Sequence, residues 1–221
     1  FFFLKFNFSH NGGTIEQPID FPDLDAFANN NFSTELEDVT RIIDFVASEE
    51  QYFTSIDSEN ISLIGHSRGG GIVLIKAEED LRVKKVITWA GVCDFKARFQ
   101  EGTETFKHWE KTGITHVENG RTKQQMPHYI QFYNDFKANE ELLTIKRAVQ
   151  NLQIPLLIVH GSGDASVLLK EAQVLHSWNP NSKIEIIDGA NHVFGTQHPW
   201  KEEKLPKDLN KVIKTSVNFL S

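Results

Sequence analysis

The stretch that decides the fold is ISLIGHSRGGG, residues 61–71. Its first four residues predict a short buried strand, and residues 68–79 predict a helix. Between them, Gly65 to Gly69 match G-x-S-x-G, the pattern of a strand that turns directly into a helix. Such a turn holds its serine in a strained, positive-φ conformation with the hydroxyl above the sheet edge. We therefore predict that Ser67 is a nucleophile; the alternative is a glycine-rich turn with an inert serine.

The spacing of the glycines has a steric reason in this pattern. The strand and helix backbones nearly touch at the turn, so the residues two before and two after the serine must be small. Gly65 and Gly69 satisfy that requirement, and Gly70 and Gly71 allow still closer packing.

Strand and helix patterns alternate along much of the chain. Strands are predicted at 61–64, 83–92, 155–160 and 183–187, and helices at 34–49, 68–79, 167–177 and 207–220. Thr34 with Glu37 has the spacing of a capping box at the start of the first of these helices. Alternation of this kind is typical of a mostly parallel sheet with helices on both faces. The predicted fold class is α/β.

The chain opens with the apolar run FFFLKFNF, residues 1–8. It lacks the basic segment and cleavage site of a signal peptide, so we predict a buried strand followed by a glycine turn at 9–13. Residues 14–33 are predicted to form a long loop. A strand that is apolar on both faces needs a neighbour on each side. We therefore expect the natural protein to carry additional strands before residue 1.

Residues 94–152 interrupt the alternation. The segment is longer than one crossover helix needs, which predicts a cap or lid inserted into a single domain that spans 1–221. It contains a set of aromatic residues: Phe95, Phe99, Phe106, Trp109, Tyr129, Phe132, Tyr133 and Phe136. They could form the small core of the cap or line an apolar pocket for a substrate.

A serine at neutral pH needs a base, itself oriented by an acid. Two polar segments follow predicted strands: HGSGD, which ends at Asp164, and GANH, which ends at His192. The carboxyl ends of parallel strands share one sheet edge, where such sites lie. Asp94 and Asp188 are alternatives for the acid. His66 and His160 are interpreted as structural, with the side chain of His66 directed away from the serine.

With these residues in place, the chain resembles a serine hydrolase of the α/β-hydrolase superfamily, in the style of the dienelactone-hydrolase-like and cinnamoyl- or feruloyl-esterase-like bacterial proteins. The resemblance implies that Ser67 is the nucleophile, Asp164 the acid, His192 the base, and the Arg68 backbone N–H one oxyanion donor. Dienelactone hydrolases carry cysteine at the nucleophile, so serine favours ordinary ester chemistry.

The second oxyanion donor of that superfamily lies on a His-Gly-type loop after the third strand. No such loop precedes Ser67, so we expect it upstream of residue 1. The alternative is that residues 9–13 supply the donor.

Composition narrows the remaining functions. The 221 residues include 23 Lys and Arg against 30 Asp and Glu, a net charge of −7, which argues against nucleic acid as a partner. One cysteine, Cys93, cannot form an internal disulfide. No apolar run approaches the roughly 18 residues of a membrane helix. We expect a cytoplasmic protein with a small ester substrate, without cofactor or metal, although His160, Asp164 and His192 could in principle hold one.

The predicted activity is hydrolysis of a carboxylic ester through an acyl-enzyme intermediate. A peptidase, an acyltransferase or a carbon–carbon bond hydrolase would use the same triad, and a catalytically silent binding protein would keep only the fold.

Overall fold

A computed structural model of the chain describes residues 1–48 and 57–221, which form two compact units. The first contains residues 1–48 and 96–143, and the second contains residues 57–95 and 144–221. Within the described ranges, no helix combines the length and hydropathy needed to cross a membrane.

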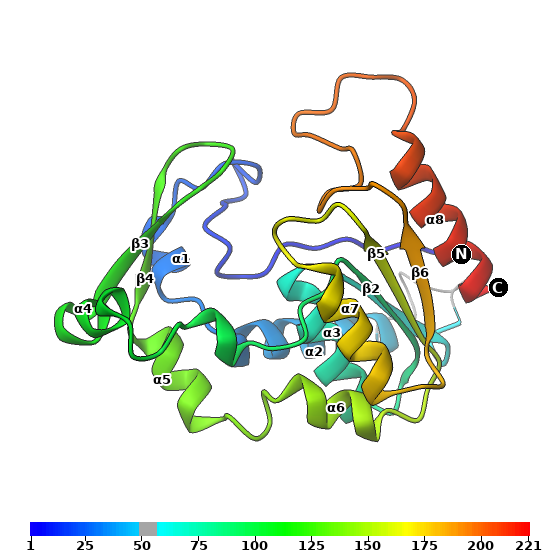
Figure 1. Ribbon diagram of the computed structural model, residues 1–221, viewed down its shortest axis with the longest axis horizontal. Helices are drawn as coiled ribbons and strands as arrows, with labels where there is room; N and C mark the ends of the chain where they lie inside the picture. The colour runs from blue at the N-terminus through cyan, green and yellow to red at the C-terminus, as the bar shows by residue number, and fades with distance from the viewer. Residues whose placement is uncertain (49–56) are drawn as a thin grey trace. The chain divides into compact units, whose positions relative to one another are not determined.

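The second unit is built on a four-stranded sheet of order β1-β2-β5-β6, in which every neighbouring pair is parallel (Figure 1). Its strands are β1 (Ile61–His66), β2 (Val83–Trp89), β5 (Leu156–Gly161) and β6 (Lys183–Ile187). Its helices are α3 (Arg68–Glu79), α6 (Ile145–Asn151), α7 (Leu169–Trp178) and α8 (Lys207–Leu220). The α/β class predicted from the sequence is confirmed.

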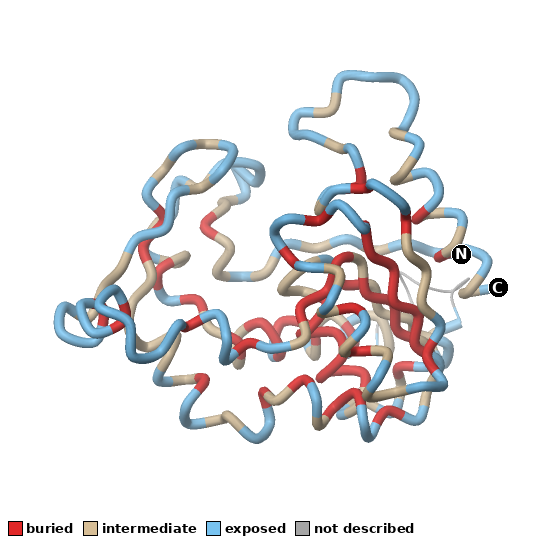
Figure 2. Tube along the Cα trace, in the orientation of Figure 1, coloured by how far each residue is buried: buried red, intermediate tan, exposed pale blue. Residues whose placement is uncertain are grey.

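Helices cover both faces of this sheet, and the alternation along β2 shows how. Ile87 packs with Leu157, Val159 and Val212 of α8 in one fully buried cluster. The next residue, Thr88, points to the opposite face, where it lies beneath Gly70 of α3. The central strand β5 is buried at all six positions (Figure 2). A strand covered on both faces needs an uninterrupted apolar run, which PLLIVH supplies.

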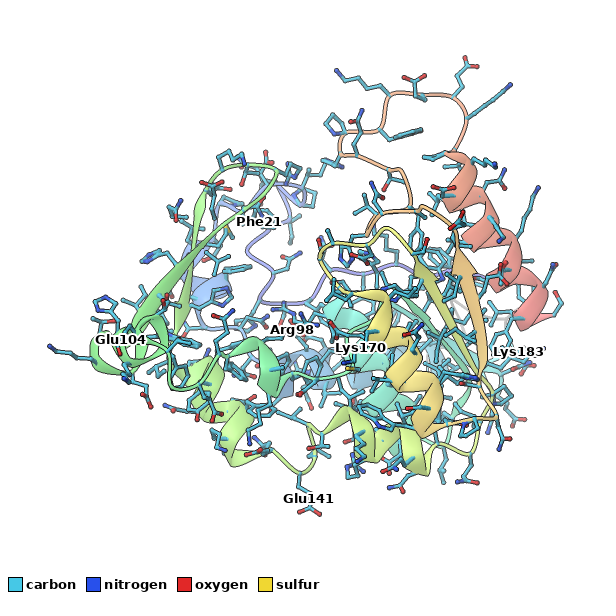
Figure 3. The ribbon with its side chains drawn as sticks, in the orientation of Figure 1. Phe21, Arg98, Glu104, Glu141, Lys170 and Lys183 are labelled. Atoms are coloured by element: carbon cyan, nitrogen blue, oxygen red, sulfur yellow. The ribbon has the colours of Figure 1, made fainter. Side chains whose placement is uncertain are left out.

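Two lysines attach the end of α8 to the sheet. Lys85 Nζ donates to the carbonyls of Phe219 and Leu220 at 3.1 and 2.7 Å, so it satisfies acceptors that the last helical turn leaves open. Lys183, at the start of β6 (Figure 3), lies 5.7 Å from the centre of the Phe219 ring. Both cations favour the negative end of the helix dipole.

The first unit has its own aromatic core. Its elements are α1 (Leu24–Ala28), α2 (Phe32–Ser48), η1 (Lys96–Arg98), α4 (Glu104–Thr112), the antiparallel hairpin of β3 (Ile114–Glu118) and β4 (Gln125–Tyr129), and α5 (Gln131–Ala138). The Phe32 ring contacts those of Phe99, Phe132 and Phe136. Phe99 also contacts Trp109 and Tyr133. Most of the predicted aromatic set thus packs as a core, while Phe95 belongs to the second unit.

The predicted strand at 1–8 is wrong. No described strand pairs with these residues, and Phe1, Phe2 and Phe3 are 58–86% exposed. A strand exists only through its ladder partners, so an apolar run without one stays irregular. The residue that follows this run, Ser9, is held by a hydrogen bond from its backbone N–H to Asp38 at 2.7 Å.

The beginning of α2 also differs from the prediction. The loop expected at 14–33 contains α1, and α2 starts at Phe32. Asn31 makes the capping contact, because its Oδ1 accepts from the Thr34 backbone N–H at 2.8 Å. Thr34 is therefore inside the helix and is not its cap. The predicted end of this helix, Glu49, lies outside the described residues.

Candidate active site

Ser67 occupies the turn between β1 and α3, with φ 56° and ψ −123°. Three hydrogen bonds hold this strained backbone: its N–H donates to the Trp89 carbonyl at 2.9 Å, and its carbonyl accepts from the N–H groups of Gly70 and Val92 at 2.9 and 3.2 Å. The side chain makes no capping bond to α3. The positive φ and the lack of a capping bond agree with the strained strand–turn–helix geometry that the G-x-S-x-G pattern predicts.

The glycines around Ser67 differ in what they must do. A Cβ on Gly65 would lie 2.2 Å from the Gly69 carbonyl oxygen, and one on Gly70 would lie 2.7 Å from the Gly91 Cα. A Cβ on Gly69 would meet nothing within 4 Å. The expectation that the second residue after the serine must be small is therefore wrong. Gly69 contributes its backbone to the close approach. Clashes with backbone fall on Gly65 and Gly70, and a Cβ on Gly71 would meet side chains at 2.6 Å.

Asp164 follows β5 and is 5% exposed. Its Oδ1 accepts from the backbone N–H groups of Ser166 and Val167 at 2.8 and 2.9 Å, and its Oδ2 lies 2.8 Å from His192 Nδ1. Burial alone would raise the pKa of Asp164. The hydrogen bonds from Val167, His192 and Ser166 outweigh it and lower the pKa. The carboxyl is therefore a charged acceptor at neutral pH.

His192 stands on the loop after β6, with its side chain one-fifth exposed. An ionised carboxylate can only accept, so Nδ1 carries the proton that it donates to Asp164. In a neutral ring, Nε2 then holds the lone pair that a general base needs. Asn191 shapes the loop, because its Oδ1 accepts from the backbone of Val193 and Gly195.

The loops after β5 and β6 fit closely against each other. A Cβ on Gly161 would lie 2.2 Å from the Ala190 oxygen, and one on Gly163 would lie 2.8 Å from the Gly189 oxygen. These contacts explain why the segments that carry Asp164 and His192 are rich in glycine.

The alternative candidates have other surroundings. Asp188 accepts from Ser162 Oγ at 3.1 Å, and Asp94 is exposed. His160 is fully buried; its Nε2 donates to the Val167 carbonyl at 2.8 Å and lies 3.5 Å from Asp164 Oδ2. In the described part of the chain, no group of three or more histidine, cysteine, aspartate or glutamate side chains is arranged to hold a metal ion.

His66 was expected to have a structural role, with its side chain directed away from the serine, and its contacts are with His192. Its side chain turns toward the base: Nε2 lies 2.8 Å from the His192 carbonyl oxygen, and the two rings are 4.7 Å apart at 43°. Although the residue is exposed at the strand end, loss of water around the imidazole lowers its pKa. No local pattern marks this contact, since it joins residues 126 positions apart.

Ser67, Asp164 and His192 follow β1, β5 and β6 of one parallel sheet, so all three stand at its carboxyl edge. The Arg68 N–H belongs to the first residue of α3, beside the serine. The model of the prolyl oligopeptidase family matches residues 9–207, and the chain belongs to that family. Together with the parallel α/β fold, this makes the protein a hydrolase of the α/β-hydrolase superfamily.

Solved structures share this fold. Est1E from Butyrivibrio proteoclasticus has a TM-score of 0.64 at 18% identity, over 86% of this chain and 70% of its own. A putative hydrolase from Agrobacterium vitis S4 has a TM-score of 0.66 at 18% identity, over 88% of this chain and 70% of its own. Dipeptidyl peptidase 4 from Porphyromonas gingivalis has a TM-score of 0.56 at 18% identity, over 86% of this chain and 22% of its own. One structure of Est1E has ferulic acid bound. No curated protein matches the chain by sequence.

Proposed function

We propose that the chain hydrolyses a carboxylic ester through an acyl-enzyme intermediate. Ser67 Oγ attacks the ester carbonyl while His192 takes its proton. His192 then protonates the departing alcohol, and water releases the acyl group by the same route. Asp164 holds the imidazole in the productive tautomer and stabilises the imidazolium. The Arg68 N–H is one proposed oxyanion donor. This chemistry needs no cofactor.

The observation that carries the proposal is the 2.8 Å contact between His192 Nδ1 and Asp164 Oδ2. It joins two loops of the sheet edge at which the strained Ser67 also stands. A buried carboxylate with two backbone donors on one oxygen and an imidazole on the other has the arrangement of a triad acid.

We also propose that residues 94–152 form an inserted cap.

The family name favours a second candidate, a peptidase. The same three groups would act on an amide, with His192 protonating a departing amine. An alkoxide leaves more readily than an amine, so a triad that cleaves an amide also cleaves the matching ester. We therefore propose ester hydrolysis as the activity to test first. The ferulic acid bound to Est1E motivates including feruloyl esters among the substrates.

Labelling with a fluorophosphonate tests the nucleophile directly, because the probe reacts with an activated serine. Wild-type protein should be labelled at Ser67, and Ser67→Ala should not be labelled. The same variant should lose about 10⁴–10⁶ of its turnover on a short activated ester, since triad members act as a unit. A variant that keeps a tenth of wild-type activity would exclude Ser67 as the nucleophile.

Paired substrates separate the two candidates. Each acyl group is offered once as a 4-nitrophenyl ester and once as a 4-nitroanilide. Turnover of esters alone supports an esterase. Comparable kcat/KM values for aminoacyl anilides would favour the peptidase.

A further inference from the structure

His66 is the last residue of β1 and precedes the proposed nucleophile by one position. We propose that His66 is a positioning residue for the reaction: its Nε2–H holds the main chain of His192 and thereby sets the base relative to Ser67. This inference rests on the proposed function, since it concerns the geometry of the same triad.

The hydrogen bond supplies a direct link between two distant parts of the sheet. A carbonyl oxygen only accepts, so Nε2 of His66 is the donor in its 2.8 Å contact with the His192 carbonyl. β1 and β6 are the two outer strands in the order β1-β2-β5-β6, so backbone ladders connect them only through two other strands. His66 gives a shorter connection, because it is joined to Ser67 by a peptide bond and its side chain is hydrogen-bonded to the backbone of His192.

Three restraints then act on the base. The His66 hydrogen bond holds its carbonyl, the His66 ring lies 4.7 Å from its ring, and Asp164 binds its Nδ1. The rest of this loop is held by Asn191 and by backbone hydrogen bonds from Gly163 N–H to the Ala190 carbonyl at 3.0 Å and from Leu209 N–H to the Phe194 carbonyl at 3.2 Å. The His66 contact is the one that acts on the carbonyl of His192 itself. A loop needs such an external attachment to hold a catalytic group within about 0.5 Å of its working position.

The charge of His66 also suits this role. The groups that act electrostatically on it are His192, Asp164 and His160. Because loss of water lowers its pKa, His66 is neutral near pH 7. A neutral neighbour does not oppose the imidazolium that forms on His192 when it accepts the serine proton.

Three variants of His66 distinguish the effect of its hydrogen-bond donor from the effect of its side-chain volume. His66→Gln keeps an N–H donor at about the reach of Nε2 but removes the ring. His66→Phe keeps a ring and removes the donor. His66→Asn has a donor that is too short to reach the carbonyl. His108→Phe, a change of the same kind at an exposed histidine of α4, is the matched control.

The measurements are kcat and KM for a 4-nitrophenyl ester and the rate of fluorophosphonate labelling of Ser67, all on the full chain. A displacement of about 1 Å costs up to roughly 10²-fold in rate. We therefore expect His66→Phe and His66→Asn to lower kcat and the labelling rate at least about tenfold, with KM within about threefold. His66→Gln should restore most of the loss, and His108→Phe should match wild type.

Two results would overturn the inference: His66→Phe with wild-type kcat, or His66→Gln and His66→Asn equally impaired. If His66→Phe does not fold, the comparison of Gln with Asn still decides, because both are amides. Failure of the proposed function would have another signature, a wild-type protein whose Ser67 is not labelled at all, and would remove both proposals.

Discussion

Asp164 is the residue whose surroundings can be tested most sharply. Replacing it by asparagine keeps its shape and its acceptor toward Ser166 and Val167, but puts an NH₂ group opposite His192 Nδ1. The imidazole must then present a lone pair there and move its proton to Nε2, the wrong tautomer for a base. In the well-studied protease case this change costs about 10⁴ in kcat.

We therefore expect Asp164→Asn to lower ester turnover by about 10³–10⁴ while Asp94→Asn stays within a few-fold of wild type. Steady-state kinetics on one activated ester measures both variants. Asp94 is the appropriate control because it also follows a strand of the same sheet, yet is exposed. A larger loss in Asp94→Asn would transfer the role of the acid to that residue.

The position of a single residue can be predicted from the sequence when a local pattern determines that position. Ser67 lies in a strand–turn–helix pattern, and Asp164 and His192 each follow a strand that ends at the same edge. Their contact at 2.8 Å follows from the parallel order of strands. The orientation of His66 was not predictable, since strand alternation alone does not say which distant loop its side chain meets.

At the scale of elements, the turn from β1 into α3 offers a matched pair of glycine substitutions. A Cβ on Gly65 would lie 2.2 Å from a backbone oxygen that cannot rotate away, whereas one on Gly69 would meet nothing. Overpacking typically lowers the free energy of unfolding by about 1–3 kcal/mol, and a clash with backbone is expected to cost the upper value or more. Alanine in place of glycine within a helix gains up to about 1 kcal/mol.

Gly65→Ala should therefore lower the free energy of unfolding by at least about 3 kcal/mol, and Gly69→Ala should leave it equal or raise it by up to about 1 kcal/mol. Urea unfolding followed by circular dichroism gives both values. Equal destabilisation of the two variants would mean that helix α3 approaches β1 differently from the arrangement described here.

Elements with a strong internal signal were predicted best. The bounds of α3, β6 and α8 agree with the sequence pattern residue by residue, because apolar periodicity and flanking turns specify them locally. The strand predicted at 1–8 was wrong for the opposite reason, since a strand depends on pairing partners elsewhere in the chain.

The hairpin of β3 and β4 was missed, although its turn contains Asn119-Gly120, a dipeptide common in hairpins. Its strands are short and largely polar, which weakens the alternating pattern.

At the scale of the whole molecule, local patterns gave the α/β class but not the division into units. Residues 96–143 pack with the N-terminal residues through aromatic contacts that join positions up to about a hundred residues apart. The strand order likewise depends on pairing between segments far apart in the chain. Periodicity within one segment carries no information on either, so both had to come from the structure.

Acid stability is a property of the whole molecule that specific carboxylates should control. Hydrogen bonds from Arg82 lower the pKa of Asp80, with Nε and Nη2 at 2.9 and 2.6 Å from its two oxygens. The pKa of Asp164 is lowered as well. A carboxyl whose pKa is lower in the folded than in the unfolded chain binds its proton first when unfolded. Its contribution to stability is complete above the unfolded pKa of about 3.9 and disappears as the pH falls through the folded value.

The free energy of unfolding should accordingly decrease as the pH is lowered from 4 toward 2, and Asp80→Asn should make that decrease shallower. Asp80 is the better probe because it lies at the end of α3 and takes no part in the proposed chemistry. Arg82→Met should flatten the profile similarly, since it removes the donors and leaves the carboxyl in place. Urea unfolding at pH 7, 4, 3 and 2 measures the slopes. If both variants lose stability as steeply as wild type below pH 4, the Asp80–Arg82 pair does not contribute to the acid response, and other carboxylates must account for it.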